Sequence, residues 1–147
     1  MSIWQTLPDP ADLGRQLENT LGEHLDMRIE AWDDSSLTAS MVVDRRTHQP
    51  MGLLHGGASV ALAETVGSIA SMLCVDRSRY YCVGQEINAN HLRGVRAGRV
   101  TAVARPLHLG RSSHVWDIRL NDEEGCLTCV SRLTVAVVPL QRDSSST

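Results

Sequence analysis

A stretch of about twenty residues with a single charged side chain constrains the fold of this chain most strongly. From about Gly56 to about Val75, small and aliphatic residues follow one another, and only Glu64 carries a charge. The larger apolar residues recur at helical spacing, which predicts a long helix with one face against a sheet. They are Leu62, Val66, Ile69 and Leu73. Because slim side chains let other elements approach closely, we expect this helix to be enclosed on most sides.

The segments around this helix mostly predict strands. Residues 9–25 predict a short amphipathic helix, with Asp9 as N-cap and Pro10 in the first turn. Residues 25–31 and 37–43 alternate apolar and polar side chains, as a hairpin does. Residues 80–138 predict four more strands, divided by "RGVRAG", "HLGR" and "NDEEG". The order predicts an α+β fold in which a curved antiparallel sheet of about six strands wraps one long central helix.

Length and charge narrow the possible classes of protein. At 147 residues we expect one domain, with an N-terminal helical extension at about 1–24 and a flexible tail at about 139–147. A net charge of -3 gives no general attraction to nucleic acid or to a membrane surface. The N-terminus lacks the pattern of a secretory signal, and no run of about 18 uninterrupted apolar residues occurs. We therefore expect a cytoplasmic protein.

The sequence "CLTC" raises the question of a zinc site. Cys126 and Cys129 stand three apart in an apolar, β-branched run that predicts a strand, where such positions face opposite sides. We therefore favour structural cysteines and expect no metal.

Glu64 is an unusual residue for the middle of such a helix. Helical spacing places it on a face with Val60, Gly67, Ser68 and Ser71. A buried carboxylate is costly without a partner or a task, so we favour a catalytic role. The alternative is an ordinary glutamate that faces solvent.

The sequence "HGG" stands where this helix begins. Free N–H groups at a helix N-terminus stabilise developing negative charge, and glycine lets a substrate approach them. Gly56 and Gly57 could therefore polarise a carbonyl group, although they could also merely permit a tight turn. Gln49 and His55 flank the turn and could orient a substrate, while a lone histidine is more often structural.

The spacing of these two features predicts a dimer. Gly56 and Glu64 are eight residues apart, or about 12 Å along a helix. An oxyanion donor and a base must both lie within about 3 Å of the reacting group. If the two act together, antiparallel helices of two chains must each supply one of them.

Basic residues are dense between residues 91 and 114, without an intervening acid. In "HLGRSSH", Gly110 could approach a phosphate while Arg111, Ser112 and Ser113 bind it. Arginines on exposed strand faces explain the pattern equally well.

Three segments together resemble a known family. "QPMGLLHGGASVALAETVGSIAS", "GQEINANHLR" and "RPLHLGRSSHVWDI" resemble hotdog-fold acyl-CoA thioesterases from about Leu25 to Val138. The branch is that of 4-hydroxybenzoyl-CoA thioesterase and the phenylacetic acid degradation-like enzymes. It also contains 1,4-dihydroxy-2-naphthoyl-CoA hydrolase and the enterobactin proofreading thioesterase.

The resemblance implies hydrolysis of an aromatic or related acyl-CoA by homodimers that commonly pair into tetramers, without metal or cofactor. It implies that Glu64 is the nucleophile or general base and that the Gly56 amide polarises the thioester carbonyl. Gln49, His55 and Ser68 would assist in catalysis. The coenzyme A contacts implied are His91, Arg93, Gly110, Arg111, Ser112 and Ser113.

Other functions remain to be weighed. An α/β-hydrolase would need a G-x-S-x-G nucleophile elbow, which is absent. A hotdog hydratase would normally pair an aspartate with a histidine in a different helix-entry motif. A non-catalytic module that binds acyl-CoA or another small ligand stays open, since fold alone does not give function.

The shape of the acyl pocket could depend on Met51, Leu54, Met72 and Val83.

Overall fold

A computed structural model describes residues 1–141. The helices are α1 (Pro10–Leu17), α2 (Leu21–His24) and α3 (Gly56–Leu73). The strands are β1 (Arg28–Trp32), β2 (Leu37–Val43), β3 (Tyr80–His91), β4 (Gly98–Leu109), β5 (Ser113–Asn121) and β6 (Leu127–Pro139). Pro139, Leu140 and Gln141 are the only described part of the expected tail, whose remainder lies outside the described residues.

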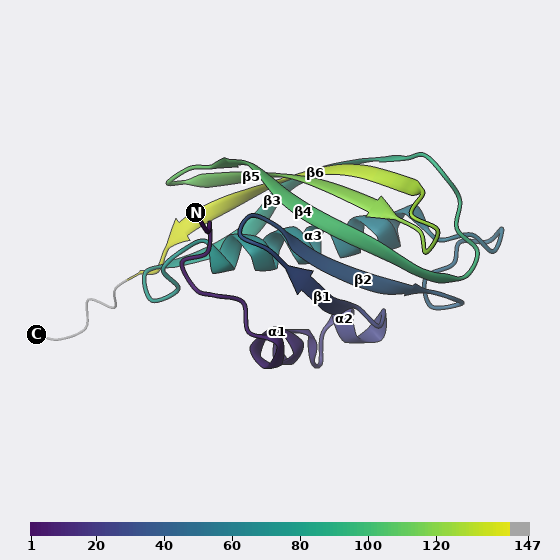
Figure 1. The fold of residues 1–147 in the computed structure, drawn as a ribbon, viewed down its shortest axis with the longest axis horizontal. Coiled ribbons are helices and arrows are strands. Elements are labelled where there is room, and N and C mark those ends of the chain that lie inside the picture. The colour runs from purple at the N-terminus through teal and green to yellow at the C-terminus, as the bar shows by residue number, and fades with distance from the viewer. Residues whose placement is uncertain (142–147) are drawn as a thin grey trace, which may run out of the picture.

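All six strands form one antiparallel sheet in the order β1-β2-β4-β5-β6-β3. The sheet curves around α3, and α1 and α2 lie beside β1 (Figure 1). This confirms the predicted architecture. The two edge strands are β1 and β3, so one side of the twelve-residue strand β3 has no partner strand within residues 1–141.

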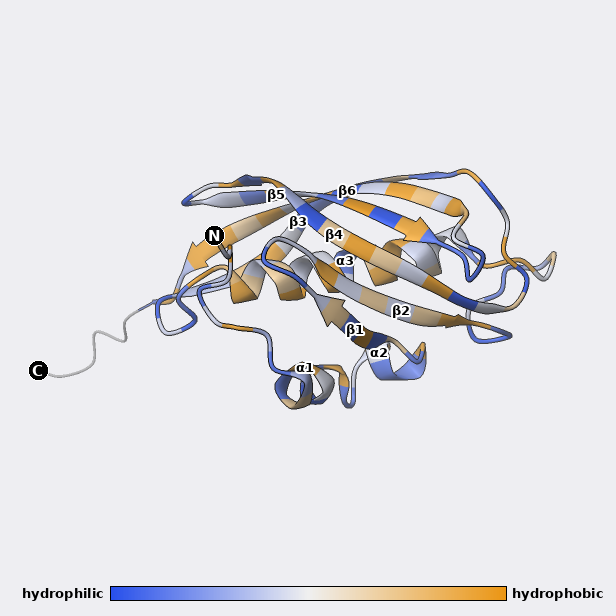
Figure 2. Cartoon of the chain, viewed as in Figure 1, coloured by the Kyte–Doolittle hydropathy of each residue, from blue (hydrophilic) through white to orange (hydrophobic). Residues whose placement is uncertain are grey.

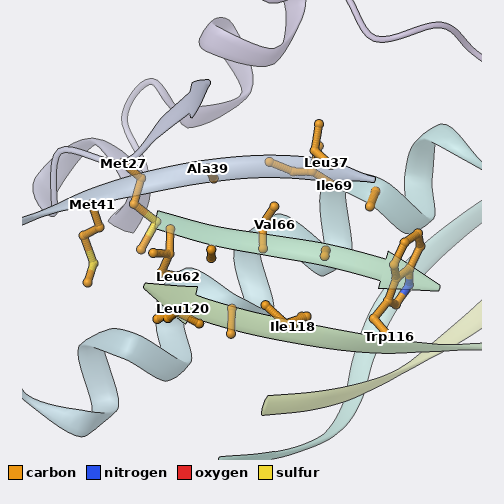
Figure 3. Close-up of a cluster of buried hydrophobic side chains, with 14 of the residues drawn as sticks. Met27, Leu37, Ala39, Met41, Leu62, Val66, Ile69, Trp116, Ile118 and Leu120 are labelled. Atoms are coloured by element: carbon orange, nitrogen blue, oxygen red, sulfur yellow. The ribbon is translucent and has the colours of Figure 1, made fainter. Parts of the chain in front are cut away.

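The core lies between the concave face of the sheet and α3. Leu62 and Val66 of α3 are fully buried against inward-facing residues of β2, β4 and β5 (Figure 3). Leu37, Ile118 and Leu120 supply part of that sheet face. The predicted apolar face of the helix is therefore confirmed, with Ile69 and Leu73 also buried.

The other side of α3 remains partly open. Figure 2 shows α3 as mostly orange or white, and its apolar length and composition would suffice for a membrane span, although half of it is buried in this fold. Beyond its first turn, the partly exposed residues of α3 form one stripe along the helix. The expectation that the helix is enclosed on most sides is therefore wrong for a single chain. These residues are Val60, Ala61, Glu64, Thr65, Ser68 and Met72.

The N-terminal segment differs from the predicted single helix. Glu18, the C-cap of α1, has extended backbone, which ends the first helix, and Asn19 then adopts a left-handed conformation with φ of 58°. The Thr20 side chain then accepts a hydrogen bond from the Gly22 N–H and starts α2. Leu13 and Leu17 are buried, as their spacing predicts, but Leu21 is 58% exposed because the break turns it away from the core.

Candidate active site

The first turn of α3 leaves one backbone donor without an acceptor. His55 is the N-cap, and its Nδ1 accepts a hydrogen bond of 2.8 Å from the Gly57 N–H. The N–H groups of Ala58 and Ser59 both point to the His55 carbonyl oxygen. Within residues 1–141 the Gly56 N–H has no acceptor. Gly56 can therefore donate to a ligand, whereas Gly57 is already engaged.

Gly56 opens into a pocket of about 350 Å³ that also holds Gln49, His91 and Arg93. The His91 ring packs on Gly56, and a Cβ atom there would lie 2.7 Å from Nε2. A side chain at position 56 would therefore have to displace the His91 ring. Of the predicted site residues, the structure brings these four together.

The loop before α3 is held by its own backbone. The Gln49 N–H donates to the Leu53 carbonyl, and the His55 N–H donates to the Thr47 carbonyl. The Gln49 Oε1 accepts a hydrogen bond from the Met51 N–H. The Gln49 amide nitrogen has no acceptor in the described part of the chain, so it too can donate to a ligand.

Glu64 lies on the open stripe of α3, in a different pocket of about 320 Å³. Its carboxylate has neither a hydrogen bond nor an ion pair with any described residue. Ser68 lines the same pocket, and the other walls come from α3 and the N-terminal segment. They are Gln16, Leu17, Thr20, Leu21, Gly22, Thr65 and Ile69.

Two residues expected beside Glu64 lie elsewhere. Gly67 packs against Leu133 of β6, and a side chain there would overlap with it. Ser71 is fully buried, and its Oγ accepts a hydrogen bond of 2.7 Å from Trp116 Nε1. Both positions therefore face the sheet. The open stripe of the helix is narrower than the three-and-four residue spacing around Glu64 predicted.

Gly84 in β3 was not predicted as a site residue. The Glu64 Oε1 lies against it, in space that a Cβ atom at position 84 would occupy. A glycine inside a strand often marks such a close approach, so "VGQEI" carried a usable signal. The absence of a side chain at Gly84 leaves room for the Glu64 carboxylate.

The two groups of candidate residues do not meet within one chain. The pocket at Gly56 and the pocket at Glu64 share no lining residue. This agrees with the helical spacing of about 12 Å between them. One chain therefore holds two separate halves of any site that needs both groups.

The candidate anion-binding residues also form two groups. On β6, His91 pairs with Cys129 whereas Ser113 pairs with Ala136, seven residues or roughly 23 Å further along. Gly110 and Arg111 line a pocket near the C-terminal end of α3, with His114. Ser112 and Ser113 lie in and after the same turn, where the Ser113 carbonyl accepts from the Gly110 N–H.

Thiol chemistry at the end of α3 is disfavoured. Burial, with a smaller contribution from Cys82, raises the pKa of the Cys74 thiol to about 12. Burial raises the pKa of Cys82 to about 11. Neither thiol forms the nucleophilic thiolate near neutral pH.

One set of potential metal ligands is present in the described residues, and it differs from the "CLTC" pair. Ligand atoms of Asp122, Glu124 and Cys126 all lie within 4.8 Å of one another. Cys129 is buried in β6 and does not join them. Asp122 Oδ1 already accepts two backbone N–H groups of this turn, so the cluster is explained as a turn.

Comparison with known proteins identifies the family. The family model of the thioesterase superfamily matches residues 51–129. PA1618 from Pseudomonas aeruginosa is 65% identical over 140 residues, which cover 95% of this chain and 97% of that protein. The crystal structure of its Q49A variant, described as a thioesterase, has a TM-score of 0.93, 64% identity, and covers 95% of this chain and 100% of that one.

Two further relatives have named activities. The 1,4-dihydroxy-2-naphthoyl-CoA hydrolase of Escherichia coli is 49% identical over 92% of this chain and 99% of its own length. The proofreading thioesterase EntH of Cronobacter turicensis is 48% identical over 92% of this chain and 98% of its own. The chain therefore belongs to the thioesterase superfamily and is a thioester hydrolase with the hotdog fold.

Proposed function

We propose that this chain is a cytoplasmic acyl-CoA thioesterase that hydrolyses an aromatic or aroyl-type CoA thioester to the free acid and coenzyme A. It would work as a homodimer, with dimers paired into tetramers, and without metal or cofactor. We place it in the branch of 4-hydroxybenzoyl-CoA thioesterase and the phenylacetic acid degradation-like enzymes. The observation that carries the proposal is the pair of unsatisfied groups on α3, the Gly56 N–H and the Glu64 carboxylate.

A second copy of the chain would complete the site. The open stripe of α3 carries no charge besides Glu64, and the free edge of β3 runs beside it. Large apolar side chains on that strand, Tyr81 and Val83, are 41% and 46% exposed. A twofold axis across α3 and β3 would cover these surfaces and bring Glu64 of one chain to Gly56 of the other.

The same arrangement would gather the coenzyme A contacts. His91 ends β3 and Tyr80 begins it, so an antiparallel pair of β3 strands sets the two ends side by side. The pocket with His91 and Arg93 of one chain would then adjoin the pocket with Tyr80 and Arg111 of the other. Anionic phosphates could bind both arginines, which are too far apart within one chain.

Hydrolysis in this site would follow from the charges of its groups. Glu64 either takes a proton from water, which attacks the thioester carbonyl carbon, or attacks that carbon itself. The Gly56 N–H of the partner would donate to the developing oxyanion, with Gln49 in support. The C–S bond then breaks and coenzyme A leaves as the thiolate, which takes up a proton. If Glu64 attacks, water subsequently hydrolyses the acyl-enzyme anhydride.

The acyl group would occupy the pocket at Glu64. Its exposed walls are more apolar than polar, and Leu21 and Ile69 line it together with Ser68. A pocket of this kind suits a flat aromatic or an aliphatic acyl group that makes a few polar contacts. Two of the residues expected to shape the acyl pocket lie elsewhere in a single chain. Leu54 lines the separate pocket that contains Gly56, and Met72 lies on the open stripe of α3.

Substitution of Glu64 tests the proposal. Glu64→Ala and Glu64→Gln should each lose most of the turnover of a panel of aroyl-, phenylacetyl- and fatty acyl-CoA thioesters, measured as free thiol released. Glu18→Gln is the matched control, because Glu18 is an exposed acid after α1 that lines neither pocket of the site and lies away from the proposed interface. Full activity in both Glu64 variants would refute the proposal. Tight binding of CoA thioesters without released thiol in the wild type would instead support a non-catalytic binding protein.

A further inference from the structure

We propose that Asp122 is a positioning residue that holds Arg93 ready for a phosphate group of coenzyme A. The inference rests on the proposed function, in which Arg93 contacts the coenzyme. Asp122 follows β5 in the turn to β6, and sequence reasoning gave it no role. It is distant in sequence from Arg93, and only the pairing of β5, β6 and β3 brings the two together.

The Asp122 side chain is fixed by the turn that it starts. Its Oδ1 accepts hydrogen bonds of 3.0 and 2.9 Å from the N–H groups of Glu124 and Cys126. Its backbone N–H donates to the Cys126 carbonyl, and its carbonyl accepts from the Gly125 N–H. The side chain is only 14% exposed. The second oxygen, Oδ2, therefore has a defined position.

That second oxygen faces Arg93. The Arg93 Nε lies 3.7 Å from Asp122 Oδ2, and the arginine side chain is 55% exposed. The Arg93 backbone is tied to β6 as well, since its N–H donates to the Thr128 carbonyl at 3.4 Å. An ion pair through Nε leaves the two terminal nitrogens of the guanidinium for another anion. An ion pair at this distance favours the rotamers of Arg93 that face Asp122, which reduces the entropy that ligand binding would otherwise cost.

Arg93 lines the pocket that also contains Gly56. Among the described residues that line this pocket, Arg93 is the one arginine, and Gln49 and His91 are its polar neighbours. An anion bound there would belong to the same ligand whose carbonyl reaches the Gly56 N–H. Asp122 would thus act on coenzyme binding through Arg93 and not touch the acyl group.

The isosteric change Asp122→Asn tests this role. Its amide oxygen can still accept the two turn N–H groups, so the melting temperature should stay near that of the wild type. Kinetics should be compared for benzoyl-CoA and for benzoyl-pantetheine, which lacks the nucleotide and its phosphates. We expect KM for benzoyl-CoA to rise roughly fivefold with kcat unchanged, and no change for benzoyl-pantetheine.

Asp117→Asn is the matched control. Asp117 also pairs with an arginine Nε, that of Arg119 at 3.0 Å, but on β5 and away from the Gly56 pocket. We expect its KM for both substrates to stay at the wild-type value. In an Arg93→Ala background, Asp122→Asn should have no further effect on KM.

Three results would overturn the inference: an unchanged KM for benzoyl-CoA, a lower one, or an equal loss with both substrates. A lower KM would mean that Asp122 competes with the ligand for Arg93. Failure of the proposed function is distinguishable, because the wild type would then neither hydrolyse any CoA thioester nor bind coenzyme A in calorimetry.

Discussion

The carboxylate of Glu64 on α3 lies against Gly84 on β3, in the space that a side chain at position 84 would fill. This contact crosses from the central helix to the edge strand of the sheet. It leaves room for the one charged side chain on the open stripe of α3. The edge strand β3 is therefore in direct contact with Glu64, the candidate catalytic base.

A methyl group at position 84 should displace the carboxylate without unfolding the protein. In Gly84→Ala the overlapping atom is the movable end of a glutamate side chain, so the melting temperature should change little. A carboxylate misplaced by about 1 Å should lower kcat by roughly a hundredfold. Gly14→Ala, where open space surrounds the glycine, should keep full activity. Wild-type kcat in Gly84→Ala would show that this contact does not place the base.

His55 should contribute to stability as a helix cap. His55→Ala removes the acceptor of the Gly57 N–H and should lower the free energy of unfolding by about 1 kcal/mol. Asparagine is a good N-cap, so His55→Asn should recover most of this loss. Chemical denaturation of the two variants measures the difference. Equal destabilisation by both changes would exclude the cap as the reason.

Leu21 should influence which acyl group is hydrolysed. It lines the Glu64 pocket and is 58% exposed, so Leu21→Ala removes an apolar wall at little cost in stability. We expect kcat/KM for a naphthoyl thioester to fall about tenfold relative to that for acetyl-CoA. Leu7→Ala, at an exposed leucine outside this pocket, should leave the ratio unchanged. The same ratio in both variants would remove Leu21 from the acyl site.

The stability of the protein should fall in mild acid because of His114. Burial, and to a smaller extent the charge of His108, lowers the pKa of His114, whose Nδ1 has no partner among the described residues. Below about pH 6.5 the unfolded chain takes up a proton at this histidine that the folded chain does not. The free energy of unfolding should therefore decrease from pH 7.5 to pH 5, and His114→Gln should flatten this dependence. Equal slopes for both proteins would contradict this account.

Much of the fold could be predicted from the sequence, because its signals are local. The apolar face of α3 and the alternation in β2 follow from side-chain periodicity, and both are buried as expected. The break between α1 and α2 could not be predicted. It depends on the extended backbone of Glu18 and the left-handed Asn19, inside a regular leucine repeat.

Distances between candidate site residues could be predicted from the sequence where both residues lie on one helix. They could not be predicted where the distance depends on the register between strands. The separation of Gly56 from Glu64 follows from the helical rise alone. The separation of Arg93 from Arg111 depends on how β3 and β5 pair with β6. The contacts of Gly84 with Glu64 and of Asp122 with Arg93 join distant segments, so only the folded chain reveals them.

Mixed dimers test most directly whether each active site takes Glu64 from one chain and Gly56 from the other. Glu64→Gln removes the base. Gly56→Pro removes the free N–H at the first helical position, where the backbone suits proline, and its ring also displaces His91 in the same half of the site. Each variant alone should be inactive. Unfolded and refolded together, the two should form mixed dimers, half of all dimers, with one intact site out of two, and recover about a quarter of wild-type activity. Mixed dimers detected by native mass spectrometry but without activity would contradict the shared site.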